Sequence, residues 1–159
     1  MPSKPLFIIL GNQLFPISEI EKNKDSYFFM AEDFNLCTYE KHHKHKLIFF
    51  LASMRKYAKE LENNNYSINY YKLNKNNLKL SYEDKIKDFI SKKKLSIIKM
   101  YEIEDKFFEK RIINFCKKNN FEIQFLESPM FLNTRNDFVN YLSKIKKPFM
   151  ATFYKQQRI

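Results

Sequence analysis

The most informative stretch of the chain is Leu6-Phe7-Ile8-Ile9-Leu10-Gly11-Asn12-Gln13, near the start of its 159 residues. The first five of these residues are apolar without interruption, which is typical of a short strand covered on both faces. Gly11 ends the run, and it is the single glycine of the chain. A strand with two buried faces favours a parallel sheet with helices on each side.

Four more short apolar runs follow this stretch along the chain, at residues 26–30, 67–73, 95–100 and 121–126. Helical periodicity separates them, over residues 46–62 and in segments that begin at Ser81, Glu104 and Thr134. Ser81 and Thr134 each precede an aspartate by three residues, a variant of the capping box. The alternation predicts an α/β fold: a five-stranded parallel, doubly wound sheet of the Rossmann or flavodoxin-like kind, with helices on both faces. No linker is evident before about residue 146, so we expect one domain over residues 1–146.

Composition narrows the possible functions. Apolar residues make up 44% of the chain, with 17 Phe and 10 Tyr, which is ample for a core. One glycine cannot build a Walker A loop or a GxGxxG dinucleotide loop, and the GxSxG and HExxH motifs are absent. The net charge of +11 is compatible with nucleic-acid binding, but the lysines are scattered rather than arranged in one stripe.

Cysteines and histidines give no metal signature. Cys37 and Cys116 form no CxxC pair, and no acidic residue or cysteine completes a ligand set with His42, His43 and His45. We therefore expect no metal site. The longest apolar run, residues 47–52, is too short for a membrane span, which predicts a cytoplasmic protein.

Polar residues follow several of the predicted strands. In open parallel sheets, ligands bind outside the carboxyl ends of the strands. The residues at that edge are Gly11, Asn12, Gln13, Glu32, Asp33, Phe34, Tyr101, Glu102 and Glu127. The set lacks Lys and Arg, so it suits a neutral heterocycle with hydroxyls better than a polyphosphate. The alternative, that these are ordinary polar loop residues, stays open.

Four segments resemble the deoxyribodipyrimidine photolyase-related family, the bacterial iron–sulfur cryptochromes and (6-4) photolyases. LFIILGNQLFP at residues 6–16 is similar to the ILGDQLSP opening of that family. YEKHHKHK at 39–46 resembles its Y-x-x-HHKxK motif, and LIFFLASMRKYAKEL at 47–61 resembles its LxxFxSAMRHFAEEL helix. FMATFYKQQR at 149–158 is similar to its MEYFYREMRR segment. Asn12 stands where the family usually has Asp.

The resemblance implies an amino-terminal domain that binds an antenna chromophore, 6,7-dimethyl-8-ribityllumazine. The FAD, the [4Fe–4S] cluster and the repair surface of the family belong to a helical domain that we expect to lie outside this chain. Residues 147–159 would then begin the connection to it. A separate FAD-binding photolyase domain is the expected partner, with DNA contacted only indirectly. The family enzyme is a DNA photolyase, but this chain alone is not expected to catalyse repair.

The antenna pocket of the family lies near the first two strands and the HHK helix. We therefore expect the chromophore against Gly11, Asn12, Gln13, Glu32, Phe34, Tyr39, Phe50 and Met54, with Glu102 as a weaker candidate. Phe50 and Met54 also have the helical period of ordinary core residues. The alternative function is a basic α/β nucleic-acid-binding or accessory protein without a small ligand.

Overall fold

The computed structural model describes residues 4–158. The chain forms two compact units, the first ending at Leu126 and the second beginning at Glu127. The expected domain boundary near residue 146 stays a prediction.

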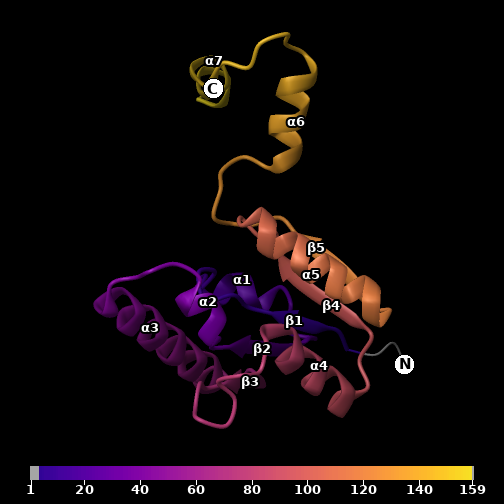
Figure 1. Ribbon diagram of the computed structural model, residues 1–159. Helices are drawn as coiled ribbons and strands as arrows, with labels where there is room; N and C mark the ends of the chain where they lie inside the picture. Colours follow the sequence, from indigo (N-terminus) through magenta and orange to yellow (C-terminus); the bar gives the residue numbers. More distant parts are fainter. Residues whose placement is uncertain (1–3, 159) are drawn as a thin grey trace. The chain divides into compact units, whose positions relative to one another are not determined.

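The first unit is built on a five-stranded sheet (Figure 1). Its strands are β1 (Leu6–Ile8), β2 (Tyr27–Ala31), β3 (Ile68–Tyr71), β4 (Ile97–Tyr101) and β5 (Glu122–Leu126). They lie in the order β3-β2-β1-β4-β5, and every pair is parallel. The prediction of a five-stranded parallel sheet is therefore confirmed.

Helices cover both faces of this sheet. They are α1 (Ile17–Glu21), α2 (Phe34–Thr38), α3 (Lys44–Asn63), α4 (Tyr82–Lys93) and α5 (Lys106–Asn119). Leu6 and Ile8 of β1 pack into a core with α4 and α5, while Phe7 packs into a second core with α1 and α3. Alternate residues of one strand thus feed two cores, which is the physical basis of the doubly wound arrangement.

Capping explains where several helices begin and end. Ser81 starts α4 with a reciprocal capping box to Asp84, as the sequence predicted. Lys94 closes α4 and Asn120 closes α5, both with left-handed backbone, at φ of 54° and 57°. The short helix α1 was not predicted, and the sequence indicates only an irregular or loosely helical segment at residues 33–44, where α2 lies. Each helix is only five residues long and shows no clear period.

The second unit consists of α6 (Arg135–Ser143) and α7 (Met150–Gln157). Thr134 forms the predicted capping box with Asp137. The Tyr141 hydroxyl donates to the Phe149 carbonyl at 2.8 Å, and the rings of Phe138 and Tyr141 pack on Phe153. These contacts join the two helices into one small unit. None of the helices within residues 4–158 combines the length and apolar character that crossing a bilayer requires.

Candidate functional site

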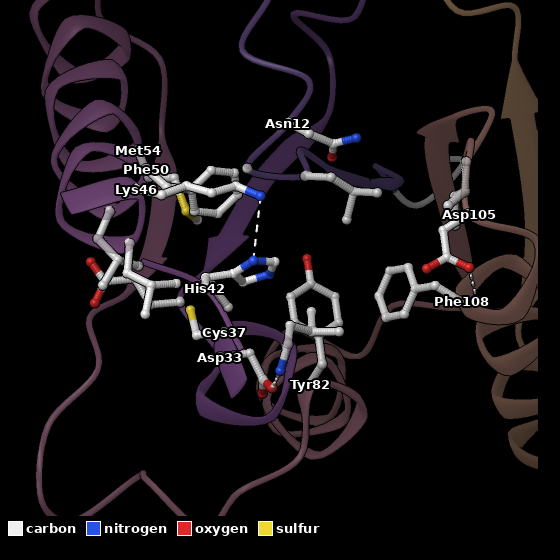
Figure 2. Close-up of a pocket in the computed structure, with 18 of the residues that line it drawn as sticks. Asn12, Asp33, Cys37, His42, Lys46, Phe50, Met54, Tyr82, Asp105 and Phe108 are labelled. Carbon is white, nitrogen blue, oxygen red and sulfur yellow. Dashed lines mark hydrogen bonds between the residues drawn. The ribbon is translucent and has the colours of Figure 1, made fainter. Parts of the chain in front are cut away.

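A cavity of about 300 Å³ opens at the carboxyl ends of β1 and β2 (Figure 2). The chain passes from β1 to β2 and β3 on one side, and then to β4 and β5 on the other. The order of the strands therefore reverses beside β1, between β1 and β4. Open α/β sheets bind ligands at such a switch point. Figure 2 shows Phe50 and Met54 of α3 on one side of the cavity and Asp105 and Phe108 on the other.

Gly11 brings β1 into close contact with α3. A Cβ atom at this position would lie 2.6 Å from Cζ of Phe50 and 2.7 Å from Sδ of Met54. Carbon atoms in optimal contact are about 3.5–4.0 Å apart, so a side chain here would displace both groups. The glycine is needed for this close approach and not for its backbone conformation, since its φ is not in the left-handed region. It thereby fixes one apolar wall of the cavity.

Tyr82 supplies a buried hydroxyl. Its ring packs edge-on against Phe29 and Phe108, with centroid distances of 6.3 and 5.6 Å, and the residue is 2% exposed. Figure 2 shows the hydroxyl pointing into the cavity, and among the described residues it has no hydrogen-bond partner. Burial raises the pKa of Tyr82, with smaller contributions from Asp33 and Glu83. The hydroxyl is therefore a protonated donor that faces the cavity.

Glu32 lines the cavity, but its carboxylate is fully engaged by the protein. Oε1 accepts from Arg55 Nε and from the Tyr70 hydroxyl, each at 2.6 Å. Oε2 accepts from Arg55 Nη2 at 3.0 Å and from the Leu73 amide at 2.8 Å. Burial alone would raise the pKa of Glu32, but the hydrogen bonds from Arg55, Tyr70 and Leu73 outweigh it and lower the pKa. Four donors occupy the four acceptor directions of the carboxylate, so its role is structural.

Asp33 and Lys85 form a buried ion pair beneath the cavity. Lys85 Nζ lies 2.7 Å from Asp33 Oδ2 and also donates to the Glu32 carbonyl at 3.1 Å. Both side chains are fully buried. Asp33 Oδ1 accepts the Leu36 amide and so caps α2. The pair therefore fixes the turn between β2 and α2, which carries Leu36 and Cys37 to the cavity.

The amides after β1 bind the loop after β4. Gln13 Nε2 donates to the Glu102 carbonyl at 2.8 Å and to Glu104 Oε1 at 3.2 Å. Asn12 Nδ2 donates to Glu104 Oε2 at 3.0 Å. An aspartate in place of Asn12 could not make this bond and would face the Glu104 carboxylate with a second negative charge. Asn12 and Glu104 are therefore a compatible pair, and the carbonyl oxygen of Asn12 is not used by this bond.

The remaining polar groups lie at the rim. Lys46 Nζ lies 3.4 Å from His42 Nδ1, and Lys46 is exposed. Burial raises the pKa of the half-buried Cys37 thiol, and the charges of Asp33 and Glu32 raise it further. Cys37 thus stays a neutral thiol near pH 7. No three His, Cys, Asp or Glu side chains within residues 4–158 lie close enough together to hold a metal ion.

The cavity brings together part of the predicted site. Five of the nine residues line it: Gly11, Asn12, Glu32, Phe50 and Met54. Four lie outside its lining: Gln13, Phe34, Tyr39 and Glu102. Gln13 is buried beneath the loops, whereas Tyr39 is 73% exposed. Their part in ligand binding stays a prediction.

Sequence reasoning missed Tyr82 and Phe108, because it considered residues directly after strands and the residues around the HHK helix, but not the starts of the later helices. A helix that follows a parallel strand also begins at the carboxyl edge of the sheet. The capping signal at Ser81 therefore placed Tyr82 at the same edge as Gly11.

Comparison with known proteins identifies a family and a relative. A family model described as deoxyribodipyrimidine photo-lyase-related protein matches residues 7–159. A (6-4) photolyase of Agrobacterium fabrum (strain C58) is 25% identical over 157 residues. That match covers 96% of this chain and 31% of the relative, so the chain spans about a third of the relative's length.

Proposed function

The chain belongs to the deoxyribodipyrimidine photo-lyase-related protein family, and from this premise we propose that its cavity binds an antenna chromophore, 6,7-dimethyl-8-ribityllumazine. The observation that carries the proposal is the cavity at the switch point of the sheet. Its volume of about 300 Å³ is at the lower end of the range for small-molecule sites, which suits a bicyclic ring.

The residues around the cavity fit a flat, neutral heterocycle. Phe50, Met54 and Phe108 supply apolar surfaces, and the Tyr82 hydroxyl supplies a donor that has no partner among the residues that the structure describes. Of the described residues that line the cavity, Lys46 alone carries a fixed positive charge, and it lies at the rim. A polyphosphate would need more cations or a glycine-rich loop.

The wider role is light-dependent DNA repair or photoreception. The bound lumazine would absorb light and make its excitation available to a flavin. In this proposal the flavin and the iron–sulfur cluster belong to a photolyase-type domain outside residues 1–159, either in the same protein or in a partner. The chain itself holds and orients the chromophore and excludes water from it, and it contacts DNA only through that partner domain.

The test is a titration of the purified chain with 6,7-dimethyl-8-ribityllumazine, followed by absorption and emission at low and high salt. We expect saturable binding with altered emission that salt leaves unchanged. Phe50→Trp should weaken binding more than about tenfold, because the larger ring fills the cavity. Phe49→Trp is the matched control, since Phe49 is the neighbouring residue of α3 and is 76% exposed.

Two outcomes would overturn the proposal. Absence of saturable binding by the unaltered chain would remove the antenna function. Equal binding by Phe50→Trp and Phe49→Trp would place the chromophore elsewhere. The alternative of nucleic-acid binding rests on the net charge of +11, and binding to nucleic acid that falls steeply with salt would favour it.

A further inference from the structure

We infer that Tyr82 determines the specificity of the cavity, because its hydroxyl selects ligands that present a hydrogen-bond acceptor to the inner end of the site. The acceptor would be a ring carbonyl or an unprotonated ring nitrogen. The inference rests on the proposed function in one respect: it takes the same cavity as a ligand site. It adds which residue discriminates among ligands and which chemical group that residue requires.

The position of the hydroxyl is fixed by its surroundings. Tyr82 is the first residue of α4, and the capping box of Ser81 and Asp84 holds that turn. Its ring is held edge-on between Phe29 and Phe108. The residue is 2% exposed, so its hydroxyl does not face bulk solvent. The donor is therefore preorganised toward the cavity, as Figure 2 shows.

Within residues 4–158, no acceptor lies within hydrogen-bond distance of this hydroxyl. The nearby Asp33 carboxylate accepts from Lys85 and from the Leu36 amide, and the Tyr82 hydroxyl donates to neither of its oxygens. The Glu32 carboxylate is saturated by its own four donors. Burial and the nearby negative charges raise the pKa of Tyr82, so the proton is retained at neutral pH. A ligand in the cavity that accepts a hydrogen bond from this hydroxyl therefore binds more tightly than one that leaves it unpaired.

This requirement discriminates between ligand classes. A ligand that enters displaces the water that would otherwise satisfy the hydroxyl, and it loses affinity unless it replaces that bond. A lumazine or flavin ring carries carbonyl groups and can replace it. An apolar bicyclic ring of similar size leaves the hydroxyl unpaired, and leaving a buried donor unpaired is costly. Apolar contact alone distinguishes such ligands poorly, whereas a fixed donor distinguishes them well.

The experiment compares Tyr82→Phe with the unaltered chain and uses two probes: 6,7-dimethyl-8-ribityllumazine and naphthalene. We expect Tyr82→Phe to bind the lumazine about tenfold more weakly, a change of about 1.4 kcal/mol, while naphthalene binds equally well or more tightly. The ligand-free variant should unfold at the same urea concentration or a higher one, because the lost hydroxyl has no partner within the described part of the chain.

Tyr57→Phe is the matched control. The Tyr57 hydroxyl is buried in the opposite core and donates to the Phe15 carbonyl at 2.6 Å. This variant should lose stability and keep its affinity for the lumazine, the reverse of the result for Tyr82→Phe. The pair separates a ligand-directed hydroxyl from a structural one.

The outcomes separate this inference from the proposed function. If the unaltered chain binds the lumazine and Tyr82→Phe binds it equally well, Tyr82 does not determine specificity and the antenna proposal survives. If the unaltered chain does not bind the lumazine, both fall. If Tyr82→Phe weakens both probes alike, the tyrosine shapes the cavity without reading an acceptor, and the inference is overturned.

Discussion

Lys85→Met removes the cation from the buried pair that Lys85 forms with Asp33. The two charged atoms lie 2.7 Å apart, and neither side chain is exposed. The substitution leaves the Asp33 carboxylate without a counter-charge and takes a donor from the Glu32 carbonyl. Breaking a buried pair by removing one partner costs about 3–5 kcal/mol, and Met keeps most of the volume, so a cavity adds little.

Urea unfolding followed by far-UV circular dichroism measures this loss, since the chain has no tryptophan to report by fluorescence. With a slope of about 2 kcal/mol per M, the loss corresponds to a midpoint lower by about 1.5–2.5 M. Lys87→Met is the matched control, because Lys87 is an exposed lysine on the same helix. Its change in stability should stay within about 0.5 kcal/mol.

A compensating variant tests the cause. Asparagine at position 33 removes the charge and keeps a side-chain oxygen that can cap the Leu36 amide. Lys85→Met combined with Asp33→Asn should therefore recover at least half of the lost stability. A loss below about 1 kcal/mol for Lys85→Met alone would refute the reasoning. So would a double variant no more stable than Lys85→Met, because the damage would then not arise from an unpaired charge.

Two further predictions concern the residues around the cavity. Gly11→Ala should lower the free energy of unfolding by about 1–3 kcal/mol and weaken lumazine binding, because the new Cβ displaces the Phe50 ring. Urea unfolding measures the loss of stability, and the lumazine titration measures the loss of affinity. An unchanged urea midpoint would contradict this prediction. Glu32 has a pKa lowered from 4.5, so its contribution to stability is complete above about that pH and is lost as pH falls through the folded pKa. Glu32→Gln should thus be less stable than the unaltered chain at pH 7. Between pH 7 and about pH 3, its urea midpoint should fall less than that of the unaltered chain. Urea midpoints of the two proteins that fall in parallel with pH would argue against this role of Glu32.

The strands were predictable because burial leaves a local pattern. A strand covered on both faces is apolar throughout, as at Leu6 to Ile8. The capping boxes that begin at Ser81 and Thr134 each span four consecutive residues, so the sequence alone indicates them. The order of the strands was not predictable in this way. It depends on which helix packs on which face, and thus on contacts between residues far apart in the chain.

The strand pattern predicted the part of the candidate site that directly follows a strand, and the family resemblance added Phe50 and Met54 of α3. Gly11 and Asn12 follow a strand in this way, but Tyr82 reaches the cavity from the start of a helix after a long loop. Lys85 was beyond sequence reasoning for another reason. A lysine in a basic chain is normally solvated, and only the fold shows that Asp33 meets it in the core.

The ends of α4 have different consequences for how this protein can change over evolution. Its first residue, Tyr82, faces the cavity, whereas its last turn closes on Lys94 in a backbone conformation that costs an L-residue about 1–2 kcal/mol. The helix spans the sheet, so Lys94 lies at the edge remote from the ligand. A glycine acquired there would relieve that cost without touching recognition. A glycine at position 94 would thus add stability that could offset destabilising substitutions in the cavity. The ligand preference could then change over evolution while the fold is kept.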